Sequence, residues 1–239
     1  MSNHTTMLAA TFALSALLVG AQATVSSRDN SDWWSALRTI ESDENSSTKT
    51  QSREPAASNF RILGITLGDD AFVKAKKRLG EAAEIHRGDA ALGRNQLCYV
   101  STSAAEKIHL IFEQGEVNFS YYLFVGGPDW NGSESCVPSK LVTKHTAPAS
   151  GLHLGQSPAQ VLAILGKPSL RRKDELIYSF MVEKKNSPES LEVVRKSKPG
   201  ISEEDLHKNY DSYTLGVDID AKFKANRLIY LAVSKSETY

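Results

Sequence analysis

The chain has 239 residues, of which 28 are basic and 28 acidic, so its formal net charge at pH 7 is zero. That balance gives no global electrostatic basis for binding nucleic acid, and we expect no nucleic-acid partner. The histidines are not spaced as metal ligands, and no phosphate loop, dinucleotide fingerprint or Gly-x-Ser-x-Gly elbow occurs. We therefore expect no metal site, no cofactor and no catalytic residues.

Residues 1–23 have the pattern of a secretory signal peptide. Met7 to Gly20 is an apolar run of 14 residues, short of the roughly 20 that span a bilayer. The A-x-A cleavage pattern follows at Ala21 to Ala23. Residues 1–6 contain no Lys or Arg, and a retained single-pass anchor is the alternative. We expect a periplasmic or secreted protein with no integral membrane span after removal of the signal.

Residues 24–58 have the composition of a disordered linker, rich in Ser, Thr, Asp, Glu and Asn. Such a segment cannot bury enough apolar surface to offset the loss of chain entropy. Within it, residues 32–40 can form two helical turns with Trp33, Leu37 and Ile40 on one face. This short helix either docks on its own domain, stays disordered or folds on a partner, and a structural role in the envelope through Trp33 and Trp34 is left open.

Residues 60–144 form a first predicted α+β unit. A helix begins at Asp69 or Asp70, which can cap it, and ends at Gly80. Alternating apolar and polar residues indicate antiparallel strands. These strands are expected at Gln96–Ser101, Lys107–Glu113 and Glu116–Val125, with a tight turn at Gln114–Gly115.

Residues 151–239 form a second predicted unit of the same plan. Ser157 and Pro158 are a strong helix start, and Gly166 ends that helix. A polar insertion, Lys184 to Tyr210, contains one further helix candidate at Ser202–Lys208. Strands are expected at Glu175–Glu183, Tyr213–Phe223 and Arg227–Ser234.

The two helical segments belong to an internal repeat. Gly64 to Gly80 and Gly151 to Gly166 both read as a short Gly-bounded phrase, a helix of about ten residues and a terminal Leu-Gly. We expect an α+β fold of two tandem small units, each with short helices packed on an antiparallel β-meander. A parallel sheet is disfavoured because turns, not crossover helices, separate the later strands.

This pattern of glycines and helix ends resembles that of the β-lactamase-inhibitor-protein fold, and also that of the BamE-type outer-membrane assembly lipoproteins. The segment from Leu154 to Pro158 and on to Leu165 to Pro168 matches best, and Leu67 to Asp70 with Leu79 and Gly80 matches less well. The resemblance implies a helix pair on a four-stranded sheet in each unit, and a concave protein-binding surface in tandem members. The lipidated N-terminal Cys of the lipoproteins is missing, and no motif carries inhibitor activity over.

The two cysteines, Cys98 and Cys136, follow the predicted signal. In an oxidising compartment such a pair is more often a disulfide than a metal site or nucleophile. The bond would close a loop of about 39 residues and contribute roughly 3 to 4 kcal/mol in the chain-entropy model. We predict the Cys98–Cys136 disulfide.

Trp130 is the candidate partner-binding residue, together with its neighbours Asp129 and Asn131. It stands among turn residues, from Gly126 to Ser133, and Trp is enriched at binding hot spots. The alternative is that Trp130 folds back over its own sheet.

Asp218 and Asp220 flank Ile219 and so project to one face of a strand, where they bind a cation, act as an acid–base pair or simply lie on a solvated surface. Basic residues also cluster in the second half, for example at Arg171 to Lys173. Such a cluster is either a solvated surface or attracts an acidic partner.

These features together predict an exported, non-enzymatic protein-binding scaffold or inhibitor-like module of the cell envelope, whose partner is another protein. The alternative is an exported enzyme or small-ligand binder with a site between the two domains.

Overall fold

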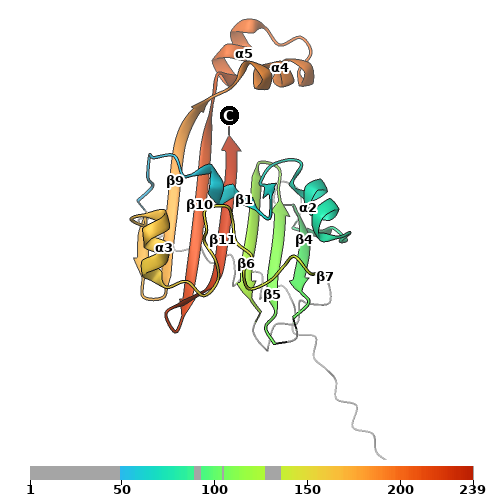
Figure 1. Cartoon of the computed structure of the whole chain (residues 1–239). Coiled ribbons are helices and arrows are strands. Elements are labelled where there is room, and N and C mark those ends of the chain that lie inside the picture. The colour runs from blue at the N-terminus through green and yellow to red at the C-terminus, as the bar shows by residue number, and fades with distance from the viewer. Residues whose placement is uncertain (1–48, 89–92, 104, 127–135, 239) are drawn as a thin grey trace, which may run out of the picture.

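The computed structural model of the chain describes residues 49–88, 93–103, 105–126 and 136–238. The predicted signal peptide, the predicted helix at residues 32–40 and Trp130 with its neighbours lie outside these residues. Most of the described chain forms one large sheet with short helices, which confirms the α+β class (Figure 1).

The helical elements are η1 (Ala57–Phe60), α2 (Ala71–Leu79), α3 (Pro158–Leu165), α4 (Pro188–Ser197) and α5 (Glu203–Tyr210). The strands of the first half are β1 (Arg61–Ile62), β2 (Ile65–Thr66), β3 (Ile85–Arg87), β4 (Arg94–Ser101), β5 (Ile108–Gln114), β6 (Asn118–Val125) and β7 (Val137–Ser139). Those of the second half are β8 (Leu170–Arg172), β9 (Glu175–Lys185), β10 (Ser212–Lys224) and β11 (Arg227–Thr238).

The large sheet has the strand order β3-β4-β5-β6-β11-β10-β9-β8, with antiparallel neighbours throughout this path. Four consecutive strands of each half therefore form a meander, as their turn-separated sequence predicts. The two meanders meet where β6 pairs with β11, and Leu123 stands opposite Leu231 in that ladder. The result is one continuous sheet.

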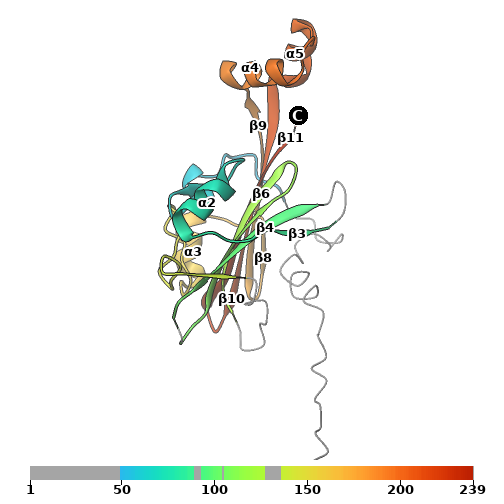
Figure 2. The same ribbon diagram turned by 90° about the vertical axis from the view of Figure 1, so that its right-hand side faces the viewer.

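Helices α2 and α3 lie on the same side of this sheet (Figure 2). Their apolar residues pack on one set of strand positions, because successive side chains of a strand point to opposite faces. We call the other side the helix-free face. The core under the helices includes Phe72, Ala75, Leu79, Leu97, Tyr99, Leu110, Phe112, Tyr121, Leu123, Val161, Leu165, Tyr178, Val217, Ile219, Leu231 and Val233.

The two predicted helix starts differ in outcome. At α3 the Ser157 hydroxyl accepts from the Gln160 N–H, and the Gln160 side chain accepts from the Ser157 N–H at 2.8 Å, a complete capping box. At α2 the N-cap residue is Asp70, but its side chain forms no cap hydrogen bond and pairs with Lys74 instead. The first helix therefore begins after a predicted cap residue, but that residue makes no side-chain cap hydrogen bond.

Each helix ends at a glycine whose carbonyl is held by a tyrosine. Gly80 and Gly166 have φ of +113° and +78°, values that favour glycine. The Tyr99 hydroxyl of β4 donates to the Gly80 carbonyl, and the Tyr178 hydroxyl of β9 donates to the Gly166 carbonyl, both at 3.1 Å. Burial raises the pKa of both tyrosines to about 12. The same contact thus ties the end of each helix to the second strand of its meander.

On their outer sides, β4 and β9 each pair with a short antiparallel edge strand and, beyond it, with a parallel segment. Next to β3, β7 pairs with β4, with Val137 opposite Tyr99. Beyond β8, residues 49–54, which we call the strap, run along β9 with Gln51 opposite Phe180. The Gln51 N–H donates to the Ser179 carbonyl at 2.9 Å, and the Met181 N–H donates to the Gln51 carbonyl at 3.0 Å. This end of the predicted linker therefore packs on the sheet.

The segments that lead into the two helices also contact each other. Ile62 forms an antiparallel bridge with Pro148, and the Ala149 N–H donates to the Arg61 carbonyl at 2.7 Å. These backbone contacts connect the two halves of the chain on the helix side, in addition to the β6–β11 ladder.

Replacing Tyr99 or Tyr178 with Phe removes one hydrogen bond to a glycine carbonyl and leaves the ring in place. We expect each variant to lose about 1 kcal/mol of unfolding free energy in urea titrations, the typical value of such a bond. The double variant should lose about the sum, since the two sites are separate. A single variant as stable as the unmodified chain would contradict the role assigned to that hydroxyl.

Candidate protein-binding surfaces

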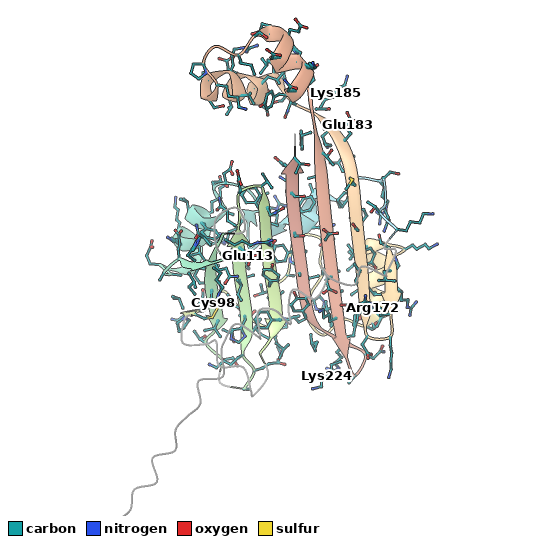
Figure 3. The ribbon with its side chains drawn as sticks, turned by 180° about the vertical axis from the view of Figure 1, so that it is seen from behind. Cys98, Glu113, Arg172, Glu183, Lys185 and Lys224 are labelled. Atoms are coloured by element: carbon teal, nitrogen blue, oxygen red, sulfur yellow. A yellow bond between two sulfur atoms is a disulfide. The ribbon has the colours of Figure 1, made fainter. Side chains whose placement is uncertain are left out.

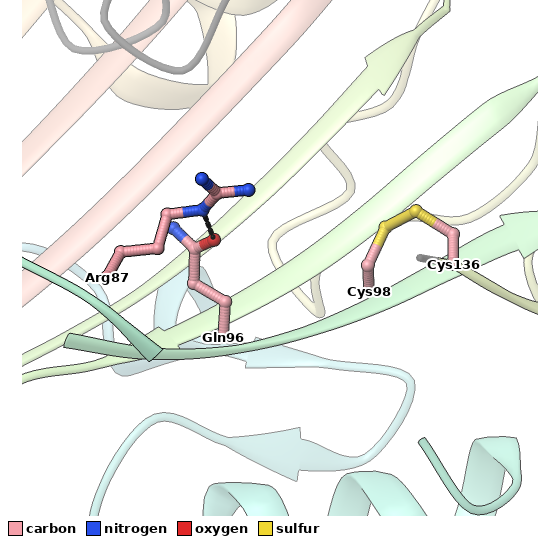
Figure 4. Close-up of a disulfide and its surroundings, with 4 residues drawn as sticks. All are labelled: Arg87, Gln96, Cys98 and Cys136. Carbon is pink, nitrogen blue, oxygen red and sulfur yellow. Dashed lines mark hydrogen bonds between the residues drawn. A yellow bond between two sulfur atoms is a disulfide. The ribbon is translucent and has the colours of Figure 1, made fainter. Parts of the chain in front are cut away.

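The predicted disulfide is confirmed. Cys98 of β4 is bonded to Cys136, which directly precedes β7 (Figure 4). Cys98 belongs to the helix-free face, and both cysteines are buried. The bond therefore holds the start of β7 beside β4.

Trp130, Asp129 and Asn131 lie outside the described residues, so their role stays a prediction. The residues that flank their segment are described. On one side, the Gly126 N–H donates to the Lys107 carbonyl at 2.8 Å. A Cβ at Gly126 would lie 2.5 Å from His109 Cε1, so any other residue there would require the buried His109 ring to shift. On the other side, Cys136 is bonded to Cys98.

The centre of the helix-free face holds a second apolar cluster, separate from the core under the helices. The His109 ring stacks on Phe124, with ring centroids 5.0 Å apart. Burial, with a smaller contribution from Lys107, lowers the pKa of His109 to about 4, so this imidazole is neutral at pH 7. The cluster consists of Cys98, Val100, Ile111, Tyr122, Phe124, Cys136, Tyr230 and Ala232.

A buried carboxylate lies beside this cluster in the first half. Glu113 of β5 accepts from Arg94 at 3.1 Å and from the Tyr122 hydroxyl at 3.2 Å, and the Gln96 amide donates to its other oxygen. The Arg87 Nε donates to the Gln96 carbonyl oxygen at 3.3 Å. A buried carboxylate with several hydrogen-bond donors has its burial cost offset by those bonds.

A second carboxylate cluster, Asp220 and Glu175, lies in the other half of the same face, and Figure 3 labels Arg172 from this cluster and Glu113 from the first half. Lys222 Nζ lies 3.4 Å from Asp220 Oδ2 and 3.5 Å from Glu175 Oε1, and Arg172 contacts Glu175 at 3.0 Å. Burial raises the pKa of Asp220 to about 7, the Lys222 charge opposes the shift and the Glu175 charge adds to it. Asp220 is fully buried, so the solvated surface considered for it is wrong.

The described residues contain no group of three or more His, Cys, Asp or Glu side chains that could hold a metal ion. Among the helices of this part of the chain, none is long and apolar enough to cross a membrane.

The insertion of the second half forms a projecting arm, which we define as α4, α5 and the end of the β9–β10 ribbon that carries them. The last rungs of this ribbon pair Lys184 with Tyr213 and Lys185 with Ser212. They lie beyond Thr238, where β11 ends opposite Thr214. Figures 1 and 2 show the two helices at the tip, well away from α2 and α3.

The arm is stabilised mainly by its own contacts. Ser187 and Ser202 cap α4 and α5. The Arg195 guanidinium donates to both Glu203 oxygens at 2.9 Å and to Glu192 at 2.6 Å, which links the helices. Such exposed ion pairs contribute little individually, so the arm depends on capping and on helix packing around the buried Leu206.

The arm also presents apolar side chains to solvent. Every residue of α4 is at least partly exposed, and Val193 is 66% exposed. Met181, on β9 near the base of the arm, is 58% exposed. Single exposed apolar residues are ordinary, but Val193 lies on a projection that does not contribute to the core, and Met181 lies on the sheet near its base.

After the helix-free face and the arm, the strap is the third candidate surface. Its side chains make specific contacts. The Gln51 amide donates to the Lys167 carbonyl and to Ser169 Oγ, both at 3.1 Å. Arg53 donates to the Leu165 carbonyl at 2.6 Å, and its guanidinium lies 4.9 Å from the centre of the Phe180 ring. The C-terminal carbonyls of a helix carry partial negative charge, which favours a cation at this position.

The strap is held on the sheet mainly by polar contacts. Besides the contacts of Gln51 and Arg53, Lys184 Nζ donates to Glu54 Oε1 at 2.6 Å, and such exposed ion pairs contribute little individually. Five of the strap's six residues are exposed, so apolar burial adds little.

No protein-family model matches this sequence, and neither a curated protein nor a solved structure matches it.

Asp220→Asn should make the chain more stable at pH 8 and no more stable at pH 4. The folded-state pKa of Asp220 lies near 7, above the usual value of about 3.9. Raising the pH from 4 to 7 therefore ionises the carboxyl in the unfolded chain first, and stability falls across that window. Asn cannot ionise, so we expect a gain of about 1 to 3 kcal/mol at pH 8 relative to pH 4. Urea titrations at both pH values measure it, and a gain that does not change with pH would contradict the assigned burial effect.

Proposed function

We propose that this is an exported, non-enzymatic scaffold of the cell envelope that binds another protein, and that the arm makes the contact. The observation that carries the proposal is the projection of α4 and α5 beyond the body, with Val193 exposed on α4 and Met181 exposed near the base. Export is supported by the Cys98–Cys136 disulfide, because such bonds persist in oxidising compartments.

The two helices of the arm are held differently from most protein helices. A helix is normally held in a protein by packing its apolar face on the core. Helices α4 and α5 pack on each other, and Val193 points away from that contact, as its exposure requires. Helices that dock into the groove of another protein place apolar side chains in it, and Val193 is the apolar side chain that α4 offers to such a groove.

We further propose that the scaffold is a tandem of two related units, as in the β-lactamase-inhibitor-like arrangement. The two tyrosine–glycine hydrogen bonds, at Gly80 and Gly166, support equivalence of the helix ends. Gly64 and Gly151 are 87 positions apart, and so are Gly68 and Gly155.

The contacts between the halves support the same relation. Offset by 87 positions, Arg61 corresponds to Pro148 and Ile62 to Ala149. The Ile62–Pro148 bridge and the Ala149–Arg61 hydrogen bond then exchange under the correspondence, as contacts across a two-fold axis do. The antiparallel β6–β11 ladder fits the same axis.

The arm can be tested by affinity capture from native envelope extract. The immobilised full chain is compared with a Val193→Glu variant, and captured proteins are quantified by mass spectrometry. We expect the specifically captured protein to decrease about tenfold with Val193→Glu, since a charge in the centre of an apolar contact costs more than 1.4 kcal/mol.

Val73→Glu is the matched control, because Val73 on α2 is 69% exposed and lies on the body. It should capture as much as the unmodified chain. The assignment of the arm would be overturned if Val193→Glu captured as much protein as the unmodified chain. It would also be overturned if Val193→Glu and Val73→Glu lost capture equally.

A further inference from the structure

The strap occupies a strand edge that would otherwise be open. β8 pairs with β9 only as far as Ile177, and Gln51 pairs with the next residues of β9. An uncovered edge strand is a template for adding another strand. The strap fills this position incompletely, since a hollow of about 510 Å³ remains between residues 49–53 and residues 167–169.

The corresponding segment of the other half is fixed more firmly. β7 pairs with β4 as the strap pairs with β9, in parallel and just beyond a three-residue edge strand. Cys136 attaches the start of β7 covalently to Cys98, and Ser139 is buried. The strap is held by hydrogen bonds and largely exposed side chains, so of the two it is the segment that can leave.

The strap and β7 occupy corresponding positions in the chain, since Gln51 corresponds to Pro138 of β7 when offset by 87 positions. β7 pairs with β4 of its own half, whereas the strap precedes the first unit and pairs with β9 of the second. The strap therefore already crosses between the two related units. A second copy carries an identical strap and an identical β9 edge.

The connection between strap and body favours exchange. Pro55 follows the strap and is buried, while Glu54 is exposed. A residue before proline is restricted to extended conformations, which fixes the backbone of Glu54 at the junction between strap and body. A terminal segment joined to the body by a short connection is a recognised setting for exchange between identical copies.

We propose that the strap of one chain docks on the β9 edge of a second copy, giving a strand-exchanged dimer. Gln51 and Arg53 of one copy then contact residues 165–169 and Phe180 of the other, by the same hydrogen bonds as within one chain. The inference rests on the proposed tandem arrangement and does not involve Val193, so capture by the Val193→Glu variant and strap exchange can fail separately.

Lysine cross-linking of the full chain tests the proposal, because Lys49 and Lys167 line the same hollow. Isotopically light and heavy proteins are mixed, and one portion is unfolded in urea and refolded together. After treatment with an amine-reactive cross-linker, we expect about half of the Lys49–Lys167 cross-links in the refolded portion to join a light and a heavy chain, the statistical value for a two-copy exchange.

Arg53→Ala should lower the amount of mixed Lys49–Lys167 cross-link formed per chain severalfold, because it removes the contacts with Leu165 and Phe180. Arg171→Ala is the control, since Arg171 is an exposed arginine of β8 that is not part of the strap. Cross-links that join only chains of equal mass in both portions would overturn the proposal. An amount of mixed cross-link unchanged by Arg53→Ala would also overturn it.

Discussion

The antiparallel ladder between β6 and β11 is the contact on which the remaining structure depends. Each half contributes a meander of four strands and a single core-facing helix, and a unit of that size buries a marginal core. Pairing Leu123 with Leu231 and Tyr121 with Val233 places fully buried residues of both halves at the centre of one sheet. The ladder also removes the edges of β6 and β11, which otherwise would be open to other chains.

Local signals in the sequence predicted most elements that form by local rules. The Ser157–Pro158 start, the Gly166 stop and the helix after Ser202 all correspond to observed elements, α3 and α5. Helix α4 was missed, although Ser187–Pro188 repeats the same start signal, because the insertion is polar and no apolar face indicated a helix. The three-residue strands β3, β7 and β8 were also missed, since short edge strands form only where a longer strand offers a partner.

Features of the candidate surfaces were likewise predictable only where the sequence carries a local signal. The disulfide followed from the number of cysteines and the expected compartment, without knowledge of the fold. The burial of Asp220 did not, because alternation along β10 indicates which face a residue occupies and not what that face is covered by. Gln51 and Arg53 had no signal, since their partners, Leu165 to Ser169, lie more than 110 positions away.

A sheet made from two meanders constrains where binding can develop. Its interior ladders are fully paired, and its helix side is occupied by the core, so changes there lower stability. The connection between β9 and β10 can change without lowering stability in this way. The ribbon continues beyond β11, so α4 and α5 stand clear of the core. The outer edges of the sheet can also vary without changing the core. Because β3 and β8 are short, part of β4 and part of β9 pair with other segments. In this fold, the differences between the two halves therefore concentrate at the tip and at the edges, which are also the positions that another chain can reach.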